Sequence, residues 1–332
     1  FCREGRDELE ALAIKNSIPI KKIGKVVVAQ NLDEEDRLET LLQRGIANGV
    51  ELERLPESEL TRFEPLARTA GSFLWSPNTA ISDPRAVTRA MVNKFEGLGG
   101  ELSYGQRIKL QRAQDGVSAK NIRAKYVINA AGAQSDRLAK ELGLAKGYAM
   151  VPFMGVYRAV SSDYLPLKRL VYPVPHPINP FLGVHFTLTL DGKVKIGPTA
   201  IPILGREQYS LFEGWSLSDI GQAITATRAL IRGESHKFGE ILKSELPKLR
   251  ESSLVRESAL LVPGAMSIRK WQKKPPGIRS QLVDIKTGKL EQDFIVENFE
   301  NSTHILNAVS PGWTSALPFG RWVAEKKVLP NL

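Results

Sequence analysis

Apolar side chains recur at helical spacing in six stretches of this chain. A spacing of three or four residues indicates one apolar face packed on a core, and it predicts helices over residues 3–15, 33–48, 56–64, 83–98, 217–249 and 314–327. Capping residues support two of these helices: Asp33 begins the second and Gly49 follows it, while Pro84 occupies the first turn of the fourth. We expect the helix over 217–249 to break near Gly233, because glycine weakens a helix.

Short β-branched runs and alternating stretches predict strands between these helices. The predicted β-segments lie within residues 24–29, 71–81, 101–125, 126–128, 151–160, 170–203, 277–296 and 304–309. Asp115-Gly116 and Asp191-Gly192 are typical of tight hairpin turns. Helix–strand alternation is interleaved with antiparallel-looking blocks, so we expect two domains that the chain visits more than once.

The stretch 126–136, Y-V-I-N-A-A-G-A-Q-S-D, combines three features of a ligand-binding turn. A buried strand leads into a side-chain-poor turn, and Ser135 and Asp136 stand where the N-cap of a following helix belongs. Such a turn places backbone N–H groups and a helix N-terminus against the phosphates or the ring edge of a cofactor. A lone A-A-G is more often a purely structural turn, so both interpretations stay open at this point.

Charge and cysteine content narrow the function classes. The 332 residues carry a net charge of +10, which suits acidic substrates, an anionic membrane surface or nucleic acid. Nucleic acid is the weakest of the three, because no zinc-finger spacing, RNP-like motif or aromatic–basic interleaving is present. Cys2 is the only cysteine, which excludes internal disulfides and cysteine-based metal clusters and favours a reducing compartment. No apolar run is long enough to span a membrane, and we expect no metal site.

Residues 171–187, V-Y-P-V-P-H-P-I-N-P-F-L-G-V-H-F-T, closely resemble the Y-P-V-P-D-P-x-x-P-F-L-G-V-H-F-T signature of the L-2-hydroxyglutarate dehydrogenase/oxidase family. The resemblance extends to F-C-R-E-G at residues 1–5 and L-N-A-V-S-P-G-W-T-S-A-L at 306–317, and so covers nearly the whole chain. Departures include His176, where the family usually has Asp. These enzymes are FAD-dependent and belong to the D-amino-acid-oxidase-like superfamily.

The resemblance implies an α+β fold with two domains. An α/β FAD-binding domain would comprise residues 1–20, 83–148 and 294–332, and an antiparallel-sheet substrate domain would comprise 21–82 and 149–293. The family's G-x-G-x-x-G turn is absent from these residues, so we expect an N-terminally truncated version of the fold. We therefore expect FAD occupancy of this chain alone to be low.

The resemblance also implies roles for three residues of the β-rich block. His185 would be the base that takes the hydroxyl proton, with an acid limb of the pH–rate profile near pH 6–7. Arg279 would clamp a substrate carboxylate through its planar fork, and Tyr172 would orient a carboxylate. The alternatives are a hydrogen-bonded core histidine, a solvated strand arginine and a packed tyrosine. His176, His236 and His304 are interpreted as structural.

For the cofactor, the resemblance implies three contact regions. The turn after the central strand would contribute Ala131, Gly132 and Ser135, and the backbone near Ile108 would meet the adenine. At the start of the last helix, N–H groups and the helix dipole would face the N1–C2=O edge of the flavin. The residues at that position are Gly312, Trp313, Thr314 and Ser315, and Thr314 and Ser315 could equally be ordinary N-cap residues.

The resulting expectation is oxidation of L-2-hydroxyglutarate, or a similar 2-hydroxy acid, to the 2-oxo acid through FAD. Electrons would leave to a quinone or oxygen, and the enzyme would be cytoplasmic, with peripheral contact at the inner face of the membrane left open. Two alternatives remain: oxidation of an amino acid, and a truncated or split fragment without activity. The pair His185 and Arg279 does not choose among these substrates.

Overall fold

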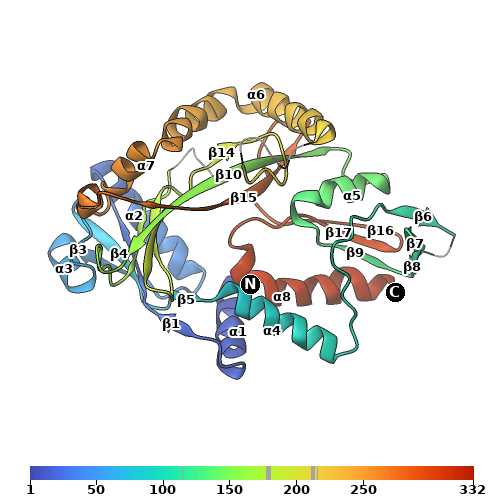
Figure 1. Ribbon diagram of the computed structural model, residues 1–332, viewed down its shortest axis with the longest axis horizontal. Helices are drawn as coiled ribbons and strands as arrows, with labels where there is room; N and C mark the ends of the chain where they lie inside the picture. Colours follow the sequence, from blue (N-terminus) through green and yellow to red (C-terminus); the bar gives the residue numbers. More distant parts are fainter. Residues whose placement is uncertain (115, 177–180, 211–213, 215) are drawn as a thin grey trace.

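The computed structural model describes residues 1–114, 116–176, 181–210, 214 and 216–332, apart from the side chains of 234–237. Asp115 of one predicted hairpin turn and the side chain of His236 therefore lie outside the described part. The fold is α+β, as predicted, and its helices flank several separate sheets (Figure 1).

A nine-stranded mixed sheet forms the largest element of the fold. Its strand order is β14-β10-β13-β12-β11-β2-β4-β3, and β15 pairs with the long strand β10 from Tyr148 to Ala159. Within the described part of this sheet, β2 and β11 pair in parallel and the other neighbouring strands pair antiparallel. The strands are β2 (Lys25–Val28), β3 (Glu53–Pro56), β4 (Ser72–Ser76), β10 (Tyr148–Ser161), β11 (Leu170–Pro173), β12 (His185–Leu188), β13 (Lys193–Gly197), β14 (Ile201–Pro202) and β15 (Gln272–Asp284).

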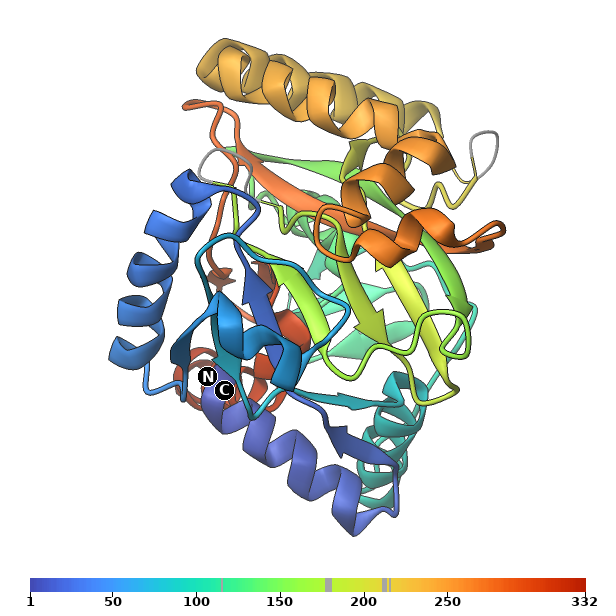
Figure 2. The same ribbon diagram turned by 90° about the vertical axis from the view of Figure 1, so that its left-hand side faces the viewer.

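Two helices, α6 (Leu217–Glu245) and α7 (Glu251–Ser258), cover one face of this sheet, and both ribbon views show them lying across β10 and its neighbours (Figures 1 and 2). The apolar face of α6 packs Ala226 and Leu230 on Val151 and Phe153 of β10. This burial removes a continuous apolar layer from water and fixes the sheet beneath it.

The predicted break of α6 near Gly233 is wrong, because the helix runs through this position without interruption. Gly233 instead permits a close approach of two backbones: a Cβ there would lie 2.2 Å from the carbonyl oxygen of Thr287. Gly288 is equally tight, since its Cβ would lie 2.2 Å from the carbonyl oxygen of Ala229. The two glycines together let the turn after β15 pack directly on the helix.

A three-stranded sheet, order β16-β17-β9, forms a second layer. β9 (Val127–Asn129) runs parallel to β17 (Ser302–Asn307), and β16 (Ile295–Phe299) pairs antiparallel with β17. The predicted meander beside it consists of β6 (Gln111–Ala113), β7 (Gly116–Ala119) and β8 (Ile122–Ala124). The last helix, α8 (Gly312–Val323), begins two residues earlier than predicted and continues into a π-helical turn over 324–328.

The remaining elements surround these two sheets. α4 begins at Pro84, as predicted, and Asp83 caps it by accepting from the N–H groups of Arg85 and Ala86 at its first turn. In the part of the chain that is described, no helix is long and apolar enough to cross a membrane. These elements are α1 (Cys2–Lys15), β1 (Ile20–Lys22), α2 (Leu32–Ala47), α3 (Leu60–Phe63), β5 (Ala80–Ser82), α4 (Pro84–Gly97) and α5 (Ser135–Glu141).

The chain leaves and re-enters these layers several times. The three-stranded sheet combines β9 with β16 and β17, which lie more than 150 residues later in the chain. Segments far apart in the sequence thus share one sheet, which is the type of interleaving that the sequence suggested. The division into an FAD-binding domain (1–20, 83–148, 294–332) and a substrate domain (21–82, 149–293) stays a prediction.

Candidate active site

A buried network holds the Ala130-Ala131-Gly132 turn that follows β9. The side-chain oxygen of Asn129 accepts from the N–H of Ala131 at 3.2 Å. Its amide nitrogen donates to the carbonyl oxygen of Ser135 at 2.8 Å and to Nδ1 of His304 at 3.0 Å. Gly132 has a φ of +54°, a conformation that favours glycine. The conformation of the turn is therefore fixed by hydrogen bonds of Asn129 and by the glycine at position 132.

Arg206 ties this turn to the helical layer. Its guanidinium donates to the carbonyl oxygen of Ala133, to both carboxylate oxygens of Asp136 and to the side chain of Gln222 in α6. Arg206 is 2% exposed and Asp136 is fully buried. Burial alone would raise the pKa of Asp136, but the hydrogen bonds and charge of Arg206 hold that pKa below its ordinary value.

A cavity of about 760 Å³ opens beside this turn. Its wall combines Ala131 and Gly132 with Gly312 of α8 and with Arg279 and Ser280 of β15. Nε of Arg279 and Oγ of Ser280 are buried and lack a hydrogen-bond partner among the described residues. Buried polar groups are rarely left unpaired, so the wall offers free donors, one of them cationic, next to a backbone turn. These features fit a flat, anionic cofactor.

The other predicted cofactor residues lie around this cavity rather than in its wall. Ile108 packs in an apolar cluster with Leu110 and Val117. Ser135 is the first residue of α5 rather than an N-cap, because a 3-10 turn over Gly132–Gln134 precedes the helix; its hydroxyl donates to the carbonyl oxygen of Leu306. Their roles toward FAD stay predictions.

At the start of α8, the predicted residues point into different surroundings. The hydroxyl of Ser315 donates to the carbonyl oxygen of Pro311, which is the N-cap residue of the helix. Ser315 and Thr314 are therefore not N-caps. Trp313 and Thr314 line a separate cavity of about 360 Å³ together with Lys25. Their roles as FAD contacts, like that of Ser315, stay predictions.

His185 is positioned as a neutral proton acceptor. It begins β12, is 8% exposed, and its Nδ1 lies 2.9 Å from the carbonyl oxygen of Gly183. Because a carbonyl can only accept, Nδ1 carries the proton and Nε2 presents its lone pair. Burial lowers the pKa of His185 to about 4, and the charges of Lys25 and Lys195 add to this effect. The ionisation expected near pH 6–7 is therefore shifted downward.

Tyr172 stacks beside this histidine. The two rings lie 4.1 Å apart between centroids, on neighbouring strands β11 and β12. Burial raises the pKa of Tyr172 above its ordinary value, while a hydrogen bond with Thr187 opposes the rise. Nζ of Lys25 lies 5.1 Å from the centroid of the Tyr172 ring. The phenol is therefore neutral and can donate a hydrogen bond.

Arg279 lies on β15, with β10 and β13 between it and the strand of His185. Three strand spacings separate the two backbones by roughly 14 Å across the sheet. The guanidinium carbon of Arg279 lies 5.0 Å from the centroid of the Phe181 ring, and burial lowers the pKa of Arg279. Among the described residues, no carboxylate forms an ion pair with Arg279. A ligand, rather than a direct contact, would have to connect Arg279 with His185.

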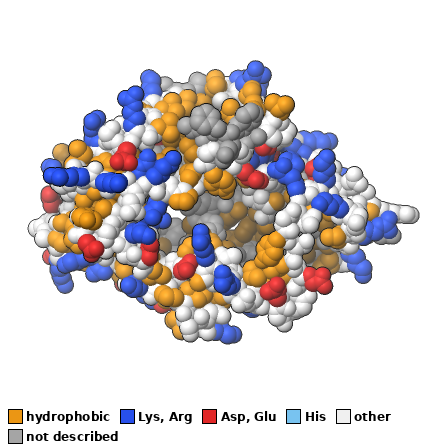
Figure 3. Space-filling model, viewed as in Figure 1, with side chains coloured by type: hydrophobic (Ala, Val, Ile, Leu, Met, Phe, Trp, Pro, Cys, Tyr) orange, Lys and Arg blue, Asp and Glu red, His pale blue; other side chains and the backbone are white. Residues whose placement is uncertain are grey.

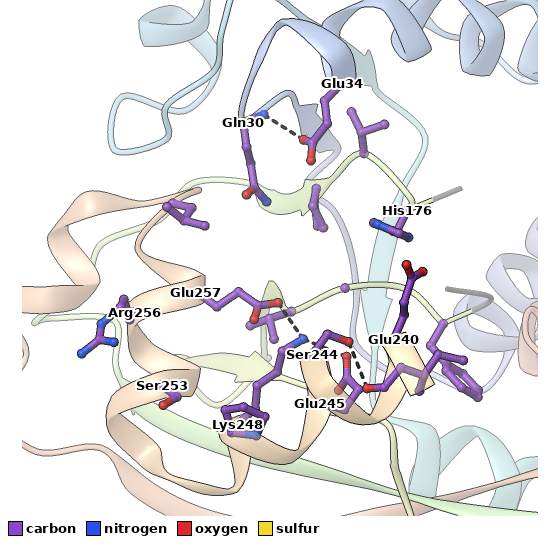
Figure 4. Close-up of a pocket in the computed structure, with 18 residues that line it drawn as sticks. Gln30, Glu34, His176, Glu240, Ser244, Glu245, Lys248, Ser253, Arg256 and Glu257 are labelled. Carbon is purple, nitrogen blue, oxygen red and sulfur yellow. Dashed lines mark hydrogen bonds and ion pairs between the residues drawn. The ribbon is translucent and has the colours of Figure 1, made fainter. Parts of the chain in front are cut away.

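Another cavity, of about 710 Å³, lies behind the loop that precedes β12 (Figure 4). Lys248 lies between Glu245 and Glu257, with Nζ 2.8 Å from a carboxylate oxygen of each. Val184 and Gly183 form part of its wall. The buried lysine of this cavity is thus fully paired, and its network is explained by the packing of α6 against α7.

Sequence reasoning missed several residues of this arrangement. Lys25 and Lys195 flank His185, and Arg206 holds the turn, but none of the three was predicted. A charged residue within the apolar strand K-V-V-V was a visible signal for Lys25. His304 was predicted to be structural, and its contact with Asn129 agrees with that.

The cavity beside the glycine turn, with α8 in its wall, is compatible with a bound cofactor. Residues 1–326 match the FAD dependent oxidoreductase (DAO) family. The chain belongs to this family, and is therefore an FAD-dependent enzyme of the oxidoreductase class.

Similar proteins within the family include several with a common name. The chain is 33% identical to the L-2-hydroxyglutarate dehydrogenase of Escherichia coli (strain K12), over 98% of this chain and 78% of that protein. It is 31% identical to the mitochondrial L-2-hydroxyglutarate dehydrogenase of Caenorhabditis elegans, over 99% of this chain and 78% of the relative. A solved structure of L-alpha-glycerophosphate oxidase from Mycoplasma pneumoniae with FAD bound is similar in fold, with a TM-score of 0.68 at 22% identity, covering 92% of this chain and 72% of that one.

Proposed function

We propose that this enzyme oxidises L-2-hydroxyglutarate to 2-oxoglutarate. The observation that carries the proposal is the similarity, along 98–99% of the chain, to bacterial and animal dehydrogenases of that name. The site supports it, because oxidation of a hydroxy acid needs a base for the hydroxyl proton and cations for the carboxylates.

His185 is the residue we assign as the base. Its Nδ1–H is held by the carbonyl oxygen of Gly183, so Nε2 is the atom that receives the proton of the substrate hydroxyl. Tyr172, stacked on the imidazole, would keep the ring in place and donate to the substrate. Arg279, which lacks a carboxylate partner among the described residues, would bind one substrate carboxylate through its planar fork.

Ala131, Gly132 and Gly312 are the residues of the cavity wall that would hold the cofactor. FAD, when bound, accepts the hydride that leaves C2 of the substrate. Arg279 and Ser280 of β15 also line this cavity, so we place its substrate end on the β15 side.

The chief alternative is oxidation of an amino acid. It is favoured by one observation, a fold likeness to a glycine oxidase from Geobacillus kaustophilus at a TM-score of 0.67 and 16% identity, covering 97% of this chain and 76% of that one. The flavin-loaded enzyme, assayed with a reducible dye, distinguishes the two: L-2-hydroxyglutarate should be oxidised and L-glutamate should not. Faster oxidation of L-glutamate would replace the proposal by its alternative.

For the electron acceptor we propose a quinone or oxygen. Turnover with a soluble ubiquinone analogue, compared with oxygen consumption, separates the two. For the location we propose a cytoplasmic enzyme, and the net charge of +10 motivates peripheral contact with an anionic membrane surface. Co-sedimentation with anionic but not with neutral vesicles tests that contact, and equal recovery from both would remove it.

A further inference from the structure

Two lysines approach the Tyr172–His185 pair from both sides. Lys25 lies on β2, next to the strand of Tyr172, and Lys195 lies on β13, next to the strand of His185. In the register of the sheet, Lys195 stands opposite Thr187, which follows His185 by two positions and so points to the same face. The positive charges of both lysines lower the pKa of His185.

Neither lysine has a carboxylate within ion-pair distance in the described part of the chain, although the charge of Asp191 opposes the larger effect of burial on the pKa of Lys195. Burial lowers the pKa of each lysine. A desolvated ammonium without a partner costs free energy. Lys248, by contrast, is buried and forms ion pairs with two glutamates. Lys25 and Lys195 therefore differ from this structural lysine of the same fold.

An open cavity adjoins the first of these lysines. Lys25 lines the cavity of about 360 Å³, together with Arg3 and Arg6 of α1 and with Thr314 of α8. Glu10 is the one carboxylate that contributes to this lining. Figure 3 shows a hollow near the middle of one face of the molecule, with blue Lys and Arg side chains at its rim. A small anion in this cavity could therefore reach Lys25, while Lys195 does not line the cavity and is itself partly exposed.

We propose that Lys25 and Lys195 bind the substrate carboxylate that is remote from the reacting carbon, and that this pair makes the enzyme selective for dicarboxylates. The site then has two anion-binding positions on one sheet, Arg279 on β15 and the lysine pair around His185. This inference rests on the proposed function, because it assigns the second carboxylate of the 2-hydroxy acid to named residues.

The same two lysines link the binding of the substrate carboxylate to the basicity of His185. In the free enzyme the two ammonium groups oppose protonation of His185. A carboxylate seated between them cancels much of that charge, so Nε2 becomes a stronger base when a dicarboxylate is bound. A substrate without the second carboxylate leaves the base weak.

The first experiment measures binding to the protein itself by titration calorimetry. Glutarate, a five-carbon dicarboxylate, is compared with pentanoate, which has the same length and one carboxylate. In Lys25→Met and in Lys195→Met the Kd of glutarate should rise roughly 10- to 100-fold, as expected when a charged hydrogen bond is lost. Binding of pentanoate should be unchanged.

Matched variants control for folding and for net charge. Methionine keeps the apolar stem over the Tyr172 ring, and Lys25→Arg, which keeps the charge, should restore most of the glutarate affinity. Lys286→Met removes one charge from an exposed position in the turn after β15 and should bind glutarate like the parent. If glutarate and pentanoate lose affinity equally in Lys25→Met and Lys195→Met, or if Lys286→Met matches them, the inference is wrong.

Turnover separates this inference from the proposed function. The flavin-loaded parent should prefer L-2-hydroxyglutarate over L-2-hydroxypentanoate, and Lys25→Met should abolish that preference by raising KM for the first substrate alone. Failure of the parent to oxidise either acid, with glutarate binding still dependent on Lys25, would refute the proposed function and support the lysine pair. Normal oxidation with an unchanged preference in Lys25→Met would refute the lysine pair alone.

Discussion

Acidification should destabilise this protein through His185 in a narrow pH window. Burial lowers the pKa of His185 from 6.5 to about 4 in the folded chain, whereas in the unfolded chain the imidazole titrates near its ordinary value. The unfolded state therefore binds one more proton between those two pH values, and stability falls as the pH drops from about 6.5 to about 4. Above this pH window His185 is neutral in both states, and its full contribution to the free energy of unfolding is present.

The size of the effect follows from the same shift. Each pKa unit corresponds to about 1.4 kcal/mol, so the contribution of His185 to the loss approaches about 3 kcal/mol. Against a typical total stability of about 5–15 kcal/mol, such a loss is readily measured. His304, which is fully buried and has a pKa lowered to about 4, should add a loss of similar size in the same window.

Urea unfolding between pH 7 and pH 4 provides the assay, with the parent compared to His185→Asn. The variant should lose about 3 kcal/mol less than the parent across the window, whatever its stability at pH 7. Parallel curves for the parent and His185→Asn would refute the reasoning, and with it the buried neutral imidazole that the proposed mechanism requires.

Three further predictions concern single side chains. Gly233→Ala should destabilise the protein despite better helix propensity, because its Cβ would lie 2.2 Å from a carbonyl oxygen; Gly239→Ala, where a Cβ meets nothing within 4 Å, should stabilise it by up to about 1 kcal/mol, and equal melting temperatures would contradict this. Arg206→Met should cost about 3–5 kcal/mol in urea unfolding, because it leaves the carboxylate of Asp136 buried and unpaired; a loss below about 1 kcal/mol would speak against the clamp. Arg279→Lys should lower kcat/KM of the flavin-loaded enzyme at least tenfold, because lysine lacks the paired fork; a change within a few-fold would exclude a carboxylate clamp.

Local signals predicted most of the secondary structure. The helix over 83–98 begins at Pro84, which was predicted to occupy its first turn. The helix over 33–48 matches α2 within one residue at each end, although Asn31 rather than Asp33 provides the cap. The strand before the A-A-G turn and the helix after it were also predicted, but the strand is not buried as expected, because Ile128 is 52% exposed. Caps and strand-ending turns depend on neighbouring residues alone, so the sequence carries them directly.

Features that depend on distant contacts were not predictable in this way. Gly233 was interpreted as a helix break because its partner, Gly288, lies more than 50 residues away and is brought near only by the sheet. Lys25 and Lys195 meet around His185 through a register that joins four strands. The family resemblance located the candidate base, but the residues that set its pKa come from tertiary packing.

The hydrogen bonds of Arg206 affect how the protein unfolds. One guanidinium contacts Ala133 and Asp136 beside the cofactor turn and Gln222 on the helix that covers the large sheet. Separating the two layers would leave an unpaired buried charge on each side. The free energy of local opening at the turn is therefore nearly as large as that of opening the helix. The cofactor-side and sheet-side layers should therefore unfold in one cooperative transition, and hydrogen exchange should report a common protection for α5 and the first turns of α6.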